Sequence, residues 1–117
     1  MKLSLNRILL LGTCCAGLFL AWNYSLAQAG TTNRATVEVR DAGNNFNFAP
    51  STVTIKKGGT VTWVWKGRIS HNVYGSGLNS GFRTKGQWPK RFTRTGTYSY
   101  YCVIHPSMRG KVVVRSS

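Results

Sequence analysis

GTYSYYCVIHPSMRGKVVV, which spans residues 96–114, is the most informative stretch of the chain. Its first part places Tyr100 and Cys102 on one face of an alternating pattern, the period of a β-strand with one buried side. Its last part carries three consecutive valines, which predict a second strand because β-branched residues favour that structure. Cys102, His105 and Met108 lie between the two predicted strands at the spacing C-x-x-H-x-x-M, so three metal-ligating residue types share one short connection.

Alternation of apolar and polar residues recurs upstream of this stretch. Turn-forming residues at 41–45, at Pro50-Ser51 and at Lys57-Gly58-Gly59 separate the alternating segments. After residue 30, no segment of useful length has the 3.6-residue period of a helix. This pattern therefore predicts an all-β domain, an antiparallel Greek-key β-sandwich of about seven to eight strands. The upstream positions that share the one-face pattern are Ala35, Val37, Val39, Phe46, Phe48, Val53, Ile55, Val61, Trp63 and Trp65.

Residues 1–29 have the three parts of a secretory signal peptide. A basic start precedes a 15-residue apolar run over 8–22, and Ala27-Gln28-Ala29 supplies small residues for cleavage. A helix over this run would span about 22 Å, less than the roughly 30 Å of a membrane core. An uncleaved anchor and, more weakly, a lipoprotein modified at Cys14 are the alternatives. We therefore expect a cleaved signal peptide and one exported domain over 30–117, in the periplasm or, alternatively, in the thylakoid lumen.

The chain is strongly basic, with 16 Lys and Arg against two acidic residues among 117, a formal charge of +14. Removal of residues 1–29 leaves +12 and a single cysteine, Cys102, which cannot form an internal disulfide. Such a charge predicts partner proteins with acidic docking surfaces or an anionic membrane surface. Charge alone also suggests a nucleic-acid binder, but export argues against it, and no nucleic acid is expected. With 42% apolar residues and one long apolar run, the composition excludes a disordered chain and a membrane-spanning bundle.

The two histidines of the chain complete a set of metal-ligating residues. His71 lies 31 residues before Cys102, at the end of a predicted strand. Taken singly, such a cysteine is usually a buried apolar residue, a histidine in a turn is usually solvated, and a methionine is usually core filler. A thiolate, two imidazoles and a thioether together form the ligand set of a blue-copper electron-transfer site. The hypothesis is therefore one type 1 copper ion bound by His71, Cys102, His105 and Met108.

Six motifs occur in order along the chain: Phe48-Ala-Pro50, Val53-Thr-Ile-Lys-Lys-Gly58, Thr60-Val-Thr-Trp63, His71-Asn-Val73, Gly96-Thr-Tyr-Ser-Tyr-Tyr-Cys102 and His105-Pro-Ser-Met108-Arg-Gly-Lys-Val112. In these motifs the chain resembles the cupredoxins, in the plastocyanin and amicyanin branch. The resemblance implies His71, Cys102 and His105 as in-plane copper ligands and Met108 as the weak axial ligand. It also implies that the backbone N–H of Asn72 donates to the sulfur of Cys102.

These observations predict a soluble, exported, monomeric one-electron carrier that is not an enzyme. Electrons are expected to pass at the edge of His105, beside Pro106, and Tyr101 is a second candidate surface for redox partner proteins. A copper carrier that hands on its metal without redox turnover is the alternative, because the same ligands would serve it. A metal-free adhesion domain is a further alternative. Both histidines are committed to one site, which excludes the additional copper centres of a multicopper oxidase or a copper nitrite reductase.

Overall fold

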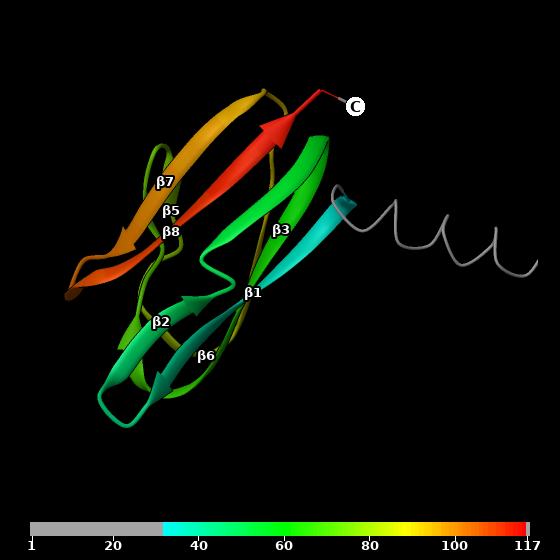
Figure 1. The fold of residues 1–117 in the computed structure, drawn as a ribbon. Helices are drawn as coiled ribbons and strands as arrows, with labels where there is room; N and C mark the ends of the chain where they lie inside the picture. Colours follow the sequence, from blue (N-terminus) through cyan, green and yellow to red (C-terminus); the bar gives the residue numbers. More distant parts are fainter. Residues whose placement is uncertain (1–31, 117) are drawn as a thin grey trace, which may run out of the picture. The chain divides into compact units, whose positions relative to one another are not determined.

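The computed structural model describes residues 32–116, and every regular element within them is a β-strand (Figure 1). The strands are β1 (Thr32–Ala42), β2 (Asn45–Ala49), β3 (Thr52–His71), β4 (Tyr74–Gly75), β5 (Leu78–Asn79), β6 (Arg83–Arg91), β7 (Gly96–Cys102) and β8 (His105–Arg115). The all-β class and the number of strands confirm the sequence prediction. The predicted signal peptide, residues 1–29, lies outside the described residues. Among residues 32–116, no helix is long and apolar enough to cross a membrane.

The strands pair in the order β2-β1-β3-β8-β7-β4-β5, and β6 joins β3. The β1–β2, β3–β6, β4–β5, β4–β7 and β7–β8 pairs are antiparallel, as predicted. Two pairs, β1–β3 and β3–β8, are instead parallel, so the sheet is mixed and the expected antiparallel pairing does not extend to these two pairs. Alternation cannot distinguish the two arrangements, because side chains alternate with a period of two in both.

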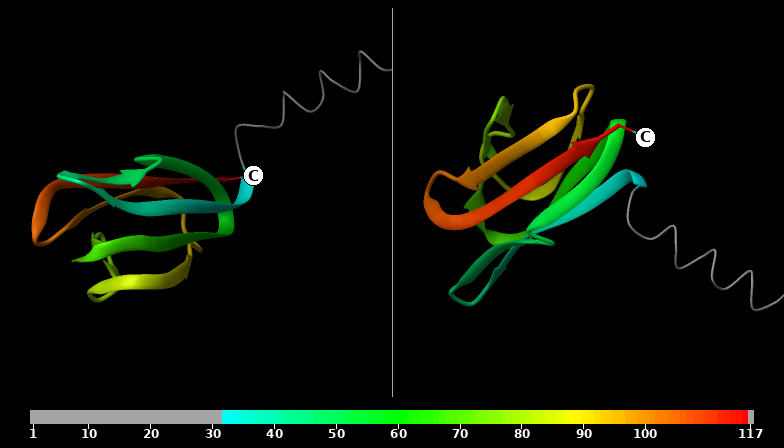
Figure 2. Two further views of the ribbon diagram at one scale, coloured as in Figure 1. Left: turned by 90° about the horizontal axis from the view of Figure 1, so that it is seen from below. Right: turned by 45° about the horizontal axis from the view of Figure 1, so that its top comes forward.

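β3 is one long bent strand, although the sequence predicts two strands separated by a turn at Lys57–Gly59. Its first part pairs with β8, and its second part, from Thr60 onward, pairs with β1 and β6 (Figure 2). Gly58 has a φ of 87°, which favours glycine. A Cβ on Gly59 would lie 2.7 Å from the carbonyl oxygen of Asn33, so only glycine fits there without a shift. The two glycines therefore bend the strand without ending it.

β6 is a strand that the sequence analysis did not identify. Its residues are mostly exposed, and only Arg83 and Trp88 are half-buried, so no apolar alternation marks it. Trp88 pairs with Trp63 of β3, and their ring centroids lie 5.4 Å apart. Lys85 and Lys90 lie along the same strand, and charged residues of this kind protect a strand edge from unwanted pairing.

The core follows the predicted alternation. Val61 and Trp63 are fully buried and Trp65 is 3% exposed, as one face of β3 requires. The ring of Tyr100 in β7 packs against Trp63 and against Phe48 of β2, with centroid separations of 5.4 and 4.8 Å. Aromatic packing thus joins three strands beside the end of β7, where Cys102 lies.

Candidate metal centre

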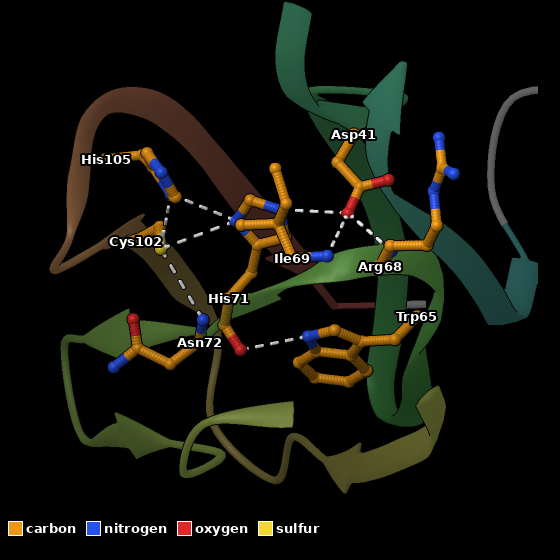
Figure 3. A network of polar contacts seen from close by, with 8 residues as sticks. All are labelled: Asp41, Trp65, Arg68, Ile69, His71, Asn72, Cys102 and His105. Atoms are coloured by element: carbon orange, nitrogen blue, oxygen red, sulfur yellow. Dashed lines mark hydrogen bonds and ion pairs between the residues drawn. The ribbon is translucent and has the colours of Figure 1, made fainter. Parts of the chain in front are cut away.

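Three ligand atoms from three strand ends converge on one point (Figure 3). His71 ends β3, Cys102 ends β7 and His105 begins β8. The Sγ of Cys102 lies 3.9 Å from Nδ1 of His71 and 3.8 Å from Nδ1 of His105, and the two Nδ1 atoms are 3.1 Å apart. The structure therefore brings together the distant histidine and the two neighbouring residues that the sequence singled out.

The connection between β7 and β8 determines the positions of Cys102, His105 and Met108. Cys102 pairs with His105 across a turn of only two residues, Val103 and Ile104. The register shifts next to this pair, so residues 106–108 bulge out of the ladder before pairing resumes. Met108 lies at the end of that bulge and is 1% exposed. The spacing C-x-x-H-x-x-M is thus a turn followed by a bulge.

Asn72 ties the end of β3 to this turn. Its backbone N–H donates to the Sγ of Cys102 at 3.5 Å, the contact that the family resemblance implies. Its side-chain Oδ1 accepts a hydrogen bond of 2.9 Å from the backbone N–H of Val103. Asn72 is 3% exposed, and its bond to Cys102 is buried, whereas its bond to Val103 is partly buried. The residue next to His71 therefore holds both Cys102 and the residue that follows it.

The surroundings of His71 keep its ring neutral and fixed. The side chain is 1% exposed, and its carbonyl oxygen accepts a hydrogen bond of 3.0 Å from Nε1 of Trp65. Burial lowers the pKa of His71, and the neighbouring His105 lowers it further. Phe46 packs against both rings, at centroid distances of 5.4 Å from His71 and 4.4 Å from His105. A neutral imidazole is the form that binds a metal.

Asp41 is a site residue that the sequence analysis missed. Its Oδ2 lies 3.6 Å from Nε2 of His71, on the side of the ring away from Cys102. The same oxygen accepts hydrogen bonds from the backbone N–H groups of Ile69 and Arg68. These bonds, that of Ile69 first, hold the pKa of Asp41 below its usual range. Its rarity was the available clue, because Asp41 is one of only two acidic residues in the chain.

The three ligand atoms have the spacing that a small soft metal ion requires. Bonds of about 2.0 Å to nitrogen and about 2.3 Å to sulfur, about 120° apart, separate sulfur from nitrogen by about 3.7 Å and nitrogen from nitrogen by about 3.5 Å. The observed separations are 3.8 and 3.9 Å for sulfur and 3.1 Å between nitrogens. Two imidazoles and one thiolate with a nearby buried thioether fit copper better than a hard cation.

The site is buried on one side and accessible on the other. Cys102 is fully buried and His71 nearly so, whereas His105 is half-buried. Pro106 is exposed, and Tyr101, on the opposite face of β7 from Cys102, is half-buried. The His105 edge is therefore the part of the ligand group nearest to solvent.

Fold and ligand set together define a copper-binding β-sandwich. Residues 35–115 match the profile of the copper binding proteins of the plastocyanin/azurin family. The chain belongs to this family. Copper as the cofactor and the expectation that the chain is not an enzyme are confirmed by this assignment.

Amicyanins are among the relatives and the solved structures that the chain matches. It is 43% identical over 68 residues to amicyanin of Paracoccus denitrificans and 36% identical over 96 residues to amicyanin-alpha of Methylorubrum extorquens. These alignments cover 51% and 75% of this chain and 52% and 75% of the relatives, so the chain spans about half the length of the first. A solved structure of an amicyanin mutant, in its reduced Cu(I) form at pH 4, superposes with a TM-score of 0.61. It is 33% identical, and the superposition covers 70% of this chain and 82% of that one.

Proposed function

We propose that the protein is an exported one-electron carrier with a single type 1 copper ion bound by His71, Cys102, His105 and Met108. His71 and His105 would contribute their Nδ1 atoms, Cys102 its Sγ, and Met108 its thioether. Bound copper supplies a one-electron couple between Cu(II) and Cu(I). The remaining chemistry belongs to the protein, which fixes the ligands, excludes water and exposes one edge to partners.

One observation carries this proposal: the ligand atoms of His71, Cys102 and His105 converge within 4.8 Å of one another and are held there by other residues. His71 is packed by Phe46, and Cys102 accepts the N–H of Asn72. Ligands fixed in this way change position little between oxidation states, which keeps the reorganisation on electron transfer small. A carrier needs this property more than it needs an open coordination position.

The exposure of the ligands supports electron transfer at the His105 edge. Val103 and Ile104, in the turn before His105, are 43% and 50% exposed, and Pro106 after it is also exposed. Exposed apolar side chains around a half-buried ligand offer a surface that a partner can cover without displacing charged groups. This arrangement favours close approach of a redox partner protein to the ligand ring.

The surroundings of Tyr101 support acidic rather than basic partners. The guanidinium of Arg109 lies 5.9 Å from the Tyr101 ring centroid, and the ring of Tyr74 meets the same ring edge-on at 5.9 Å. Both acidic residues of the chain, Glu38 and Asp41, belong to β1 rather than to β7. An acidic docking surface or an anionic membrane surface therefore complements this region.

The alternative role, delivery of copper without redox turnover, is less well supported by the geometry. Handing a metal to another protein needs an open face, whereas Cys102 is fully buried and His71 is 1% exposed. We place the protein in the periplasm, with the thylakoid lumen as the alternative, and expect a monomer. The amino-terminal signal peptide predicted over residues 1–29 carries the export part of this proposal.

Addition of one equivalent of Cu(II) to residues 30–117 tests the proposal, with visible and EPR spectra recorded beside those of Cys102→Ser. We expect an intense thiolate-to-copper band and a compressed copper hyperfine splitting in the wild type, and the loss of both in the variant. Reversible one-electron reduction of the blue form then separates a carrier from a delivery protein. A pale spectrum that the variant does not change would show that these residues do not bind copper together.

A further inference from the structure

We propose that Asp41 is a positioning residue for His71, whose carboxylate fixes the ring so that Nδ1 faces the metal and Nε2 keeps its proton. This inference rests on the proposed copper site, in which His71 is a ligand. The contact in question joins Asp41 to Nε2 of His71, the ring nitrogen that faces away from the proposed metal. The observations that carry it are the position of one carboxylate oxygen, its hydrogen bonds and a glycine beside it.

Oδ2 of Asp41 is the nearest acceptor that the structure gives for the far side of the His71 ring. It lies 3.6 Å from Nε2, an atom that is buried and has no hydrogen-bond partner within the described residues at normal length. A buried N–H without a partner is costly, whereas a small approach of the carboxylate would satisfy it. The opposite nitrogen, Nδ1, faces Cys102 and His105. Nε2 thus faces a hydrogen-bond acceptor and needs its proton, whereas Nδ1 faces the proposed metal and must be unprotonated.

The carboxylate itself is held in place by the chain that leads to His71. Oδ2 accepts backbone N–H bonds of 2.8 Å from Arg68 and 2.7 Å from Ile69, three and two residues before the histidine. The side chain of Asp41 is only 7% exposed. One oxygen therefore fixes both the backbone before His71 and the direction of its ring.

Gly67 makes room for this arrangement. A Cβ at this position would collide with the carboxylate of Asp41, so any larger residue would push the carboxylate away or shift the backbone of β3. The backbone of Gly67 has no left-handed conformation that would require glycine by itself. The reason for glycine here is the close approach of Asp41.

Glu38 provides a natural comparison on the same strand. Its carboxylate accepts from Nε of Arg40 at 2.8 Å and from Nζ of Lys66 at 3.3 Å, and all three side chains are partly exposed. It has no described contact with His71. Replacing either acid by its amide changes the net charge equally, so the two variants differ in position and contacts alone.

A carboxylate facing Nε2–H also affects the balance between the oxidation states. Carboxylate–histidine–metal arrangements raise the basicity of the ligand and hold its orientation, and loss of such a partner typically costs about 10- to 100-fold in metal affinity. The negative charge favours the more highly charged metal state. Asp41→Asn should therefore weaken binding of Cu(II) more than that of Cu(I).

The test compares Asp41→Asn with Glu38→Gln in the copper-loaded protein. We expect the Cu(II)-to-Cu(I) affinity ratio to fall about tenfold in Asp41→Asn, which raises the one-electron potential by about 59 mV. Glu38→Gln should shift the potential by less than half as much, because its charge is solvent-screened. Gly67→Ala, which keeps every charge and displaces the carboxylate, should shift the potential in the same direction as Asp41→Asn. Equal potentials in the Asp41 and Glu38 variants would overturn the inference.

A measurement on copper-free wild-type protein keeps the inference open to refutation if a variant does not fold. Nitrogen-15 NMR should show His71 protonated at Nε2, and slow amide exchange at Arg68 and Ile69. Protonation at Nδ1 would contradict the proposal. Failure of the wild type to form a blue site would refute the proposed function, whereas a blue site with no separate effect of Asp41 would refute only this inference.

Discussion

The backbone N–H of Asn72 donates to the Sγ of Cys102 across 3.5 Å, joining the end of β3 to the end of β7. These residues are 30 positions apart in the chain, and both are buried. The side chain of Asn72 adds a second link, to the backbone N–H of Val103. One residue thus fixes the end of the strand that carries His71 against Cys102 and the turn that follows it.

Asn72→Ala should destabilise the copper-free protein by about 0.5–1.5 kcal/mol, because it removes the acceptor of the partly buried N–H of Val103. Chemical denaturation measures this loss. The matched control is Asn79→Ala, whose side chain accepts only an exposed bond of 3.2 Å from Gly81. The control should change stability by less than about 0.5 kcal/mol. Equal losses in the two variants would mean that the link to Val103 does not hold the turn.

Gly110→Ala should destabilise the protein through the core. Gly110 pairs with Tyr100, and a Cβ there would overlap the phenol ring, which is buried between Phe48 and Trp63. Overpacking of this kind costs about 1–3 kcal/mol. Tyr100→Phe in the same chain should recover part of the loss, because the hydroxyl is among the overlapping atoms. A loss that Tyr100→Phe does not reduce would place the strain elsewhere.

Stability at high pH should depend on Tyr100. Burial raises its pKa to about 12 from an ordinary value of 10.0. Below pH 10 the phenol is neutral in both states, but between pH 10 and 12 the unfolded chain loses the proton first. Stability therefore falls as pH rises through this window, by about 2–3 kcal/mol for a two-unit difference. Denaturant midpoints of the copper-free protein should fall more steeply than those of Tyr100→Phe, and parallel curves would contradict this expectation.

Electron transfer to an acidic haem protein should slow as ionic strength rises from about 0.01 to about 0.5 M, because salt screens attraction between unlike charges. Arg109→Gln should reduce the low-salt rate by about two- to fivefold, since this guanidinium lies beside Tyr101. Arg115→Gln makes the same charge change at the far end of β8 and should have a smaller effect. A rate that stays flat or rises with salt would refute electrostatic steering.

Local patterns were enough to predict most of the fold. Val61, Trp63 and Trp65 alternate with polar residues, and their burial on one face of β3 follows from strand geometry alone. The strand Arg83–Arg91 escaped prediction because its side chains are mostly exposed and basic. Its place is set by backbone pairing with β3, and backbone hydrogen bonds do not depend on side-chain type.

The candidate copper ligands could also be predicted, because their residue types and their spacing can be read directly from the sequence. Cys102 and His105 are close because only two residues separate them, and His71 was the one remaining imidazole. Their convergence to within 4.8 Å is visible only in the folded chain, where the ends of β3, β7 and β8 meet.

The amino-acid sequence by itself determined most of the strands, the ligand types and the copper family, because each depends on alternation or on motifs that lie within short segments. The tertiary structure alone decided the parallel pairing of β3 with β1 and β8, and the placing of Asp41 and Phe46 around His71. Those contacts join residues 23 to 59 positions apart, and the way strands from separate hairpins come together sets them. A period of two records which face a residue occupies, but not which strand lies beside it.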